Sequence, residues 1–324
     1  MAHKNSHLIY YIKSFFMLLS PPCYLHWREK RMLADYSQRA DRDSIDRRVD
    51  YYNCLQEVAP LTRECRPLAC HTYRKRKGGS VYFFDTYEFT RYFPKHFLWN
   101  YEPGDVTCLF DSPTVTKTRP LLRDDARFPN SVVLNLDKVR HFLFVDDPIP
   151  FEQKRKIVLF RGDAVGKPQR VKFLQLFKGK AGFNVGDTSG KLDASLQGDK
   201  LSIDEHFKYR YIMALEGNDV ASNLKWVMSS NCIAVMPRPT CESWFMEGTL
   251  RPGYHYIEIR PDFSDLEERI AYYNEHIDEA RAIIAHAHEY VSQFMDAKRE
   301  RLIAYLVMRK YFEKTSVGRR VQLD

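Results

Sequence analysis

The segment from Lys208 to Glu258 reads K-Y-R-Y-I-M-A-L-E-G-N-D-V-A-S-N-L-K-W-V-M-S-S-N-C-I-A-V-M-P-R-P-T-C-E-S-W-F and, from Arg251, R-P-G-Y-H-Y-I-E. Apolar runs alternate here with a Gly-containing turn and a helical pattern. The elements that this pattern predicts are a strand 211–215, a turn 216–219, a helix 222–228, a strand 232–236 and a short aromatic helix 242–246. This order predicts a βαβ unit.

In a βαβ unit, ligands usually bind beyond the carboxyl ends of the strands, where backbone amides and a helix N-terminus attract an anionic group. Gly217, Ser222 and the loop Pro237 to Glu242 lie at that end of the predicted sheet. The spacing alone leaves an alternative open, because every α/β protein has turns of this kind. The segment therefore predicts where a ligand binds. Its detailed sequence motifs must indicate which ligand that is.

The amino-acid sequence of this segment resembles that of glycosyltransferase family 90, which includes protein O-glucosyltransferases, capsule xylosyltransferases and bacterial lipopolysaccharide-core transferases. The resemblance rests on the motifs K-Y-R-Y-I followed by E-G, A-S-N-L-K-W-V before C-I-A-V-M, E-S-W-F before P-G-Y-H-Y, F-S-D-L-E-E, F-R-G and F-D-S-P. It covers roughly residues 100 to 296, and the first hundred residues match only loosely.

This resemblance implies an α/β protein of GT-B-like fold, with two Rossmann-like α/β domains facing across a cleft and C-terminal helices. We expect an acceptor-side domain at 1–152, a donor-nucleotide-binding domain at 153–296, and a C-terminal helix at 297–324 that packs back on the first domain. The polar, Pro-marked stretch 146–156 is typical of a domain connection. Short strands at 132–136 and 142–145 complete the first domain, and the aromatic run from Val81 to Phe93 fits a strand or a helix. Helices are expected after residue 264, with one long helical stretch from 278 to about 312.

The resemblance also implies residues for a UDP-sugar donor. Arg170 matches the family's donor-binding arginine, and its planar fork suits phosphate oxygens, while Arg161 and Gly162 shape the same loop. A second family arginine is replaced here by Asn223. Lys225, two positions further on, is an alternative source of charge, although a helical residue two steps away points to another side.

Two acidic residues complete the implied site. Glu242 is placed to accept hydrogen bonds from a ribose, or else to cap a helix N-terminus. Asp111, in F-D-S-P, aligns with the family's catalytic aspartate, which takes the proton of the acceptor hydroxyl. Asp105 is the nearest rival, and an Asp before Ser-Pro is also a common turn former.

Composition sets outer limits. The chain has 324 residues, 44% of them hydrophobic, which is enough for large cores. The net charge of +8 suits an anionic partner such as nucleic acid, anionic lipid or a sugar nucleotide. The resemblance favours the sugar nucleotide, so we expect no nucleic-acid partner.

Neither cysteines nor paired aspartates indicate a metal. The seven cysteines show no C-x-x-C pair, which favours reduced thiols in the cytoplasm. Asp146-Asp147 could imitate a metal-binding carboxylate motif, but a turn explains it, and the implied GT-B class holds its donor without metal. We therefore expect no metal and no cofactor beyond the UDP-sugar substrate.

Two features indicate a membrane surface. The apolar stretch Leu8 to Leu19 is too short to span a bilayer but could lie flat in its interface, or could pack on the first domain. The basic run Arg74 to Lys77 could contact phosphate groups, or form a solvated turn. We expect a cytoplasmic protein that is peripheral to the inner face of the cell membrane.

Two functions follow. The first is an inverting, metal-independent glycosyltransferase that moves glucose, xylose or a similar sugar from a UDP-sugar to a glycan, such as lipopolysaccharide core. The second is a non-catalytic protein of the same fold that binds nucleotides or polyanions, which the loss of arginine at Asn223 favours. Release of a sugar from a UDP-sugar distinguishes them.

Overall fold

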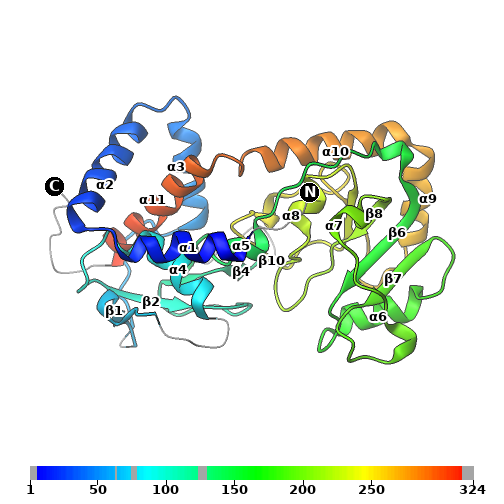
Figure 1. Cartoon of the computed structure of the whole chain (residues 1–324), viewed down its shortest axis with the longest axis horizontal. Coiled ribbons are helices and arrows are strands. Elements are labelled where there is room, and N and C mark those ends of the chain that lie inside the picture. Colours follow the sequence, from blue (N-terminus) through cyan, green and yellow to red (C-terminus); the bar gives the residue numbers. More distant parts are fainter. Residues whose placement is uncertain (1–5, 63, 74–78, 123–129, 316–324) are drawn as a thin grey trace. The chain divides into compact units, whose positions relative to one another are not determined.

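The computed structural model describes residues 6–62, 64–73, 79–122 and 130–315. Contacts divide the chain into two compact units (Figure 1). Unit 1 contains residues 140–240 and 246–293, and unit 2 contains the described parts of 5–139, 241–245 and 294–324. The division thus falls before residue 152, and the C-terminal segment belongs to unit 2. The structure is of mixed α/β type with parallel strands in both units.

Unit 1 is built on a five-stranded sheet whose strands all run parallel. Its strands are β6 (Arg155–Gly162), β7 (Phe183–Asp187), β8 (Tyr209–Met213), β9 (Ile233–Met236) and β11 (Ile257–Glu258). Their spatial order is β7-β6-β8-β9-β11. This is the 2-1-3-4-5 order of doubly wound α/β proteins.

The strands of unit 1 consist mostly of apolar residues, as expected for a sheet whose two faces are both covered by helices. All five residues of β8 are buried, and its apolar side chains do not alternate with exposed polar ones, as expected for a strand with no face toward water. Helix α6 packs on β7, and helices α8 and α10 pack on β9. The helices of unit 1 are α6 (Pro168–Phe177), α7 (Ile203–His206), α8 (Leu224–Met228), α9 (Leu266–Glu275) and α10 (Ile277–Ser292).

Unit 2 has shorter strands and more helix. Its main sheet has the order β1-β2-β3-β5, with β1 antiparallel to β2 and the other pairs parallel. A second, two-stranded sheet pairs β4 with β10. The strands are β1 (Arg66–Pro67), β2 (Leu98–Glu102), β3 (Thr114–Thr116), β4 (Thr118–Pro120), β5 (Ser131–Val133) and β10 (Cys241–Ser243). A mixed sheet of this kind differs from the parallel, Rossmann-like sheet that the sequence led us to expect in the first domain.

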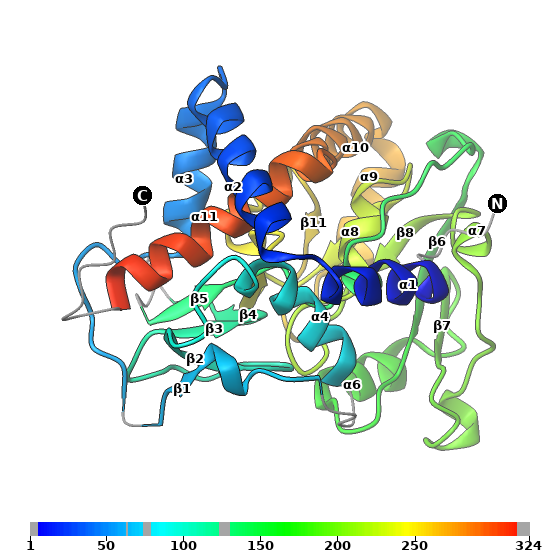
Figure 2. The same ribbon diagram turned by 60° about the vertical axis from the view of Figure 1, so that its left-hand side comes forward.

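Helices surround the sheets of unit 2. They are α1 (His7–Leu18), α2 (Pro22–Ser37), α3 (Arg42–Tyr52), α4 (Gly79–Thr90) and α11 (Ala297–Thr315), and a short helix α5 (Lys138–His141) follows β5. Helix α11 packs on α3 and α4, and α1 lies against α4 (Figure 2). The aromatic run at 81–93 therefore forms a helix over most of its length, with Phe84 and Phe89 in the core.

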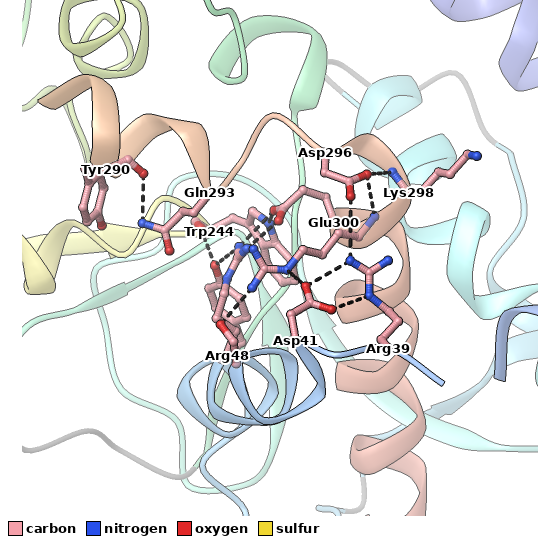
Figure 3. Close-up of polar contacts among 12 residues, drawn as sticks. Arg39, Asp41, Arg48, Trp244, Tyr290, Gln293, Asp296, Lys298 and Glu300 are labelled. Atoms are coloured by element: carbon pink, nitrogen blue, oxygen red, sulfur yellow. Dashed lines mark hydrogen bonds and ion pairs between the residues drawn. The ribbon is translucent and has the colours of Figure 1, made fainter. Parts of the chain in front are cut away.

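The short helix predicted at 242–246 does not form: Cys241–Ser243 are strand β10, and the two residues after it form a turn. Cys241–Ser243 pair with Thr118–Pro120, more than a hundred positions away in the chain, and such a partner leaves no trace in local periodicity. Trp244 stacks on Tyr52 with 3.8 Å between ring centroids, and its Nε1 donates to Glu300 at 2.6 Å. Glu300 also forms a buried ion pair with Arg48 (Figure 3). These contacts fix the segment inside unit 2.

Three further expectations need correction. Residues 142–145 form no strand, because the chain after α5 runs on without a pairing partner. The predicted helical stretch 278–312 is two helices, α10 and α11, separated at residues 293–296. The sequence predicts Ser264 as the N-cap of the next helix, in a capping box with Glu267, but the cap of α9 is Asp265, whose side chain makes no capping hydrogen bond. The basic run at 74–77 lies outside the described residues.

Candidate functional site

The topology of unit 1 places a switch point between β6 and β8. The chain leaves β6 toward β7 on one side and later returns to β8 on the other, and ligands of doubly wound proteins bind at the carboxyl ends beside such a point. Gly162 ends β6, and the turn Glu216 to Asp219 follows β8. The Gly turn of the sequence prediction therefore lies at the expected edge of the sheet.

Arg170, near the start of α6, bridges the loops that follow these two strands. Its guanidinium donates to the carbonyl oxygens of Asp163 (2.8 Å), Leu215 (2.7 Å) and Glu216 (2.9 Å). Burial lowers the pKa of this guanidinium, and it makes no ion pair with a carboxylate of the described residues. A guanidinium has more N–H donors than these three carbonyls use. Arg170 thus braces the switch point and keeps donors for an anion.

Gly162 and Gly217 stand on either side of that guanidinium. A Cβ atom on Gly162 would lie 3.4 Å from Nη1 of Arg170, and one on Gly217 would lie 3.3 Å from Nη2. The glycines thus let both backbones approach the guanidinium closely, and a Cβ atom at Gly217 would require Arg170 to shift by a few tenths of an ångström. Arg161, by contrast, turns toward β7 and donates to the backbone and side chain of Asn184 at 2.9 and 2.7 Å.

A pocket of about 290 Å³ opens beside the switch point, at the carboxyl ends of β8 and β9. This volume is at the lower end of the range of about 300 to 1,000 Å³ that is typical of small-molecule sites. Its walls are mostly apolar, with a few polar side chains. The lining residues are Gln169, Ala214, Glu216, Val220, Ala221, Leu224, Met236, Pro237, Arg238, Pro239, Thr240, Glu247 and Pro261.

Arg238 is the cation of this pocket that no carboxylate neutralises. It is exposed, lies between Pro237 and Pro239, and makes no side-chain hydrogen bond or ion pair with any residue that the structure describes. The loop that carries it is fixed, since Thr240 donates to both carboxylate oxygens of Glu216, at 2.8 Å from its amide and 2.5 Å from its hydroxyl. The two prolines limit the backbone further. A positive charge is therefore held at the rim on a rigid loop.

Two of the predicted donor-binding residues around α8, Asn223 and Lys225, contact neighbouring groups of unit 1. Lys225 is fully buried and forms an ion pair with Glu247 at 2.6 Å, so its charge balances a carboxylate of the pocket wall. Asn223 donates to the carbonyl of Met213, the last residue of β8, at 3.0 Å. Ser222 is exposed and precedes the helix, which begins at Leu224 and not at Ser222 as predicted.

Glu242 does not line the pocket. It lies in β10 of unit 2, fully buried, where Arg119 donates to one carboxylate oxygen at 2.7 Å and Tyr51 donates to the other. The expected role as a helix cap is wrong, because the residue is in a strand. A ribose that bound this buried carboxylate would have to compete with Arg119 and Tyr51, and removing one partner of a buried ion pair typically costs about 3 to 5 kcal/mol.

Asp111 lies in unit 2, in the loop that leads into β3. The residues beside it are tied down: the Phe110 carbonyl accepts from Asn130 at 2.9 Å, the Ser112 hydroxyl accepts from Asn100 at 2.8 Å, and the Pro113 carbonyl accepts from Tyr311 at 3.0 Å. The Asp111 side chain is exposed and makes no hydrogen bond or ion pair within the described part of the chain. A rigid loop thus presents a carboxylate with open acceptor positions.

The other two aspartates that the sequence analysis considered, Asp105 and Asp147, form ion pairs. Asp105 forms an ion pair with Lys117, which is only 2% exposed. Asp147 forms a buried ion pair with Lys154 at 2.6 Å and accepts from the amides of Ile149 and Asn231. Paired carboxylates of this kind stabilise loops, so Asp111 remains the better candidate for a base.

Sequence reasoning missed the polar residues of the pocket itself, Gln169, Glu216, Arg238 and Glu247. A signal for one of them was available. Arg238 lies two residues after a buried apolar strand and between two prolines, which places a stiff, charged loop at the carboxyl end of β9. The role of Glu247 had no such signal, because it depends on the packing of Lys225.

Comparison with known proteins gives consistent results. The profile of Glycosyl transferase family 90 matches residues 139–315. The O-glucosyltransferase LpsA of Dichelobacter nodosus is 38% identical over 318 residues, which cover 96% of this chain and 97% of LpsA. Protein O-glucosyltransferase 3 of Rattus norvegicus is 27% identical over 34% of this chain and 22% of its own length. Protein O-glucosyltransferase 2 of Danio rerio is 31% identical over 29% of this chain and 19% of its own length. The profile match over more than half of the chain and the likeness to LpsA along nearly all of it show that the chain belongs to glycosyltransferase family 90.

Proposed function

We propose that this glycosyltransferase moves a sugar from a UDP-sugar to a hydroxyl group of a glycan, with inversion at the anomeric carbon and without a metal ion. The observation that carries the proposal is the pocket at the carboxyl ends of β8 and β9, with a cation at its rim that no carboxylate neutralises. In a family of sugar transferases, the anionic ligand that fits such a place is the diphosphate of a nucleotide sugar.

Charge for the diphosphate comes from Arg238 and Arg170 in this proposal. Arg238 supplies the charge that the family arginine would have supplied at Asn223, and Arg170 adds the N–H donors that its three carbonyl partners leave. Lys225 is a weaker candidate, because a ligand would have to compete with Glu247 for it. Charge-assisted hydrogen bonds to phosphate stabilise the departing UDP as negative charge develops on it.

The carboxylate of Asp111 acts as the general base. The acceptor oxygen attacks the anomeric carbon, the bond from that carbon to the diphosphate breaks, and UDP leaves with the electron pair while the hydroxyl proton goes to Asp111. One displacement of this kind inverts an α-linked donor. The exposed carboxylate and the fixed loop around it support this role.

The likeness to LpsA supports glucose as the sugar and a bacterial surface glycan such as lipopolysaccharide core as the acceptor class. We place the reaction in the cytoplasm, where seven free cysteines are expected to stay reduced. The GT-B arrangement, in which two α/β domains face one cleft, is part of the same proposal and follows from the family resemblance.

A panel of nucleotides tests the proposal. In buffer with excess chelator, UDP and a UDP-sugar should raise the melting temperature by several degrees, because a ligand that binds only the folded state stabilises it, while ADP and GDP should not. The same UDP-sugar should release UDP when an acceptor glycan is added. Stabilisation without any sugar release from UDP-glucose, UDP-xylose or UDP-galactose would instead indicate the non-catalytic nucleotide-binding protein. A strict requirement for manganese or magnesium would contradict the metal-free donor site.

A further inference from the structure

Helix α1 contacts the rest of unit 2 through the hydroxyl groups of Tyr10 and Tyr11 and through the ring of Phe15, which packs on Phe84 with 5.2 Å between the ring centroids. The Tyr10 hydroxyl donates to Asp85 at 2.9 Å and lies 3.2 Å from the carbonyl of Val81, and the Tyr11 hydroxyl lies 2.8 Å from that of Ser80. Ser14, one turn further along, is only 2% exposed. All three partner residues lie in α4, against which α1 packs (Figure 2). These hydrogen bonds therefore come from the side of α1 that faces α4.

The outward face of α1 is apolar. Leu8, Ile12, Phe16 and Leu19 follow one another at spacings of three and four residues, which places them on one side of the helix, with Ile9 beside them. Between 48% and 75% of each of these five side chains is exposed. A surface helix of a soluble protein normally shows the reverse order, with apolar side chains inward. We call these five residues the α1 apolar face.

The next helix adds interfacial residues. Tyr24 and Trp27 of α2 are 40% and 55% exposed, and their rings lie 6.0 Å apart. The guanidinium carbon of Arg31 lies 5.6 Å from the centroid of the Trp27 ring, and Lys30 is exposed beside it. Amphipathic aromatic rings combined with basic side chains are typical of the boundary between lipid headgroups and acyl chains.

We propose that the α1 apolar face, with the aromatic and basic residues of α2, binds the surface of an anionic lipid bilayer. No single helix of the described residues is long and apolar enough to cross a membrane; α1 and α2 reach that length only together, and the chain bends by 108° between them. A helix of 12 residues with one apolar side is instead suited to lie in the plane of the interface.

Charge decides between a membrane and a second copy of the chain. Lys13, Lys30 and Arg31 are exposed on the same two helices as the apolar face. Anionic headgroups attract these side chains, with a strength that falls within a Debye length. Two copies that met through this region would bring like charges together, which weakens association. The bilayer is therefore the occupant that satisfies both the apolar and the basic residues.

Flotation with lipid vesicles tests this inference on the full chain. The wild-type protein should float with vesicles of phosphatidylcholine and phosphatidylglycerol at low salt and should bind pure phosphatidylcholine vesicles more weakly. The double variant Ile12→Ser, Phe16→Ser should lose about tenfold or more of its binding, since two apolar side chains no longer leave water. The control Leu176→Ser, on α6 and 49% exposed, should bind as the wild type does.

A charge variant tests the contribution of the basic residues to vesicle binding. A check of folding and a check for dimers accompany it. Lys30→Glu with Arg31→Glu should weaken binding to the anionic vesicles and leave binding to phosphatidylcholine unchanged. Stabilisation by UDP, measured on every variant, verifies folding and separates this inference from the donor proposal. Wild-type flotation of the Ile12, Phe16 variant would overturn the inference, as would a wild-type protein that binds neither vesicle. A dimer in vesicle-free solution that the same substitutions dissociate would show a protein interface instead.

Discussion

Asp111 and Arg238 differ from most charged side chains near them in having no ion pair among the described residues. Lys225 is paired with Glu247, Glu242 with Arg119, and Lys117 with Asp105. A buried pair holds elements together and is costly to break, whereas an exposed charge on a rigid loop keeps its donors or acceptors for a ligand. At the scale of single residues, the unpaired charges are therefore the ones to which we assign the chemistry.

The first residue-scale prediction concerns Arg238. Arg238→Ala should weaken UDP binding by roughly 10- to 100-fold, because a charge-assisted hydrogen bond contributes about 1.5 to 3 kcal/mol. Calorimetric titration with UDP measures this directly. Arg260→Ala is the matched control, since Arg260 is also exposed and lines a neighbouring hollow but not this pocket. Equal losses of UDP affinity in the two variants would mean that the nucleotide responds to the net positive charge of unit 1 and not to a specific contact with Arg238.

At the scale of elements, an aromatic cluster joins α4 to β2 in unit 2. The His71 ring lies 5.0 Å from the rings of Phe83 and Trp99 and 5.6 Å from that of Tyr101, and its Nε2 lies 2.7 Å from the Thr86 hydroxyl. Burial lowers the pKa of His71 to about 4. A charged imidazole therefore does not fit this cluster.

This shift predicts how stability depends on pH. His71 has a pKa of 6.5 when unfolded and about 4 when folded, so its contribution is complete above pH 6.5 and is lost as the pH falls toward 4. At one pKa unit per 1.36 kcal/mol, the loss is about 3 kcal/mol. Denaturant unfolding at several pH values should show a loss of this order in the wild type that is absent in His71→Gln, whose amide does not titrate. If the free energy of unfolding depended on pH in the same way in the wild type and in His71→Gln, a buried neutral His71 ring would be contradicted.

The elements also show why the sequence predicted some parts of the fold and not others. The strands of unit 1 are continuous apolar runs followed by turns, so β8, β9 and the Gly turn between them could be placed within two residues. The strand β10 could not, because its only signal is a partner strand at Thr118–Pro120. The surroundings of Glu242 could not be predicted for the same reason, because its partners Arg119 and Tyr51 are distant in sequence.

At the scale of the whole molecule, the two candidate halves of the chemistry belong to different units. Unit 1 holds the pocket, Arg170 and Arg238, and unit 2 holds Asp111. The family motifs pointed to Arg170 and Asp111, because Arg170 follows the F-R-G motif at the end of β6 and Asp111 belongs to the F-D-S-P motif that leads into β3. They did not reveal that Lys225 and Asn223 serve the packing of α8, since a hydrogen bond and an ion pair depend on the assembled unit.

The proposed transfer reaction depends on Asp111 as its general base. Asp111→Asn keeps the size of the side chain but cannot accept the acceptor's proton, so transfer from a UDP-sugar to the glycan should fall by about 100- to 10,000-fold. UDP binding and the melting temperature should stay unchanged, because the side chain is exposed and lies outside the donor pocket. Asp105→Asn is the comparison: it should lower stability, because it removes the negative charge that pairs with the buried Lys117 ammonium, and it should retain transfer.

The most direct test is therefore the transfer rate of Asp111→Asn, measured with the UDP-sugar that the wild type uses and with folding verified by UDP stabilisation. We expect a folded protein that binds UDP and transfers almost no sugar. Transfer within a few-fold of the wild-type rate would contradict the assignment of Asp111 as the base.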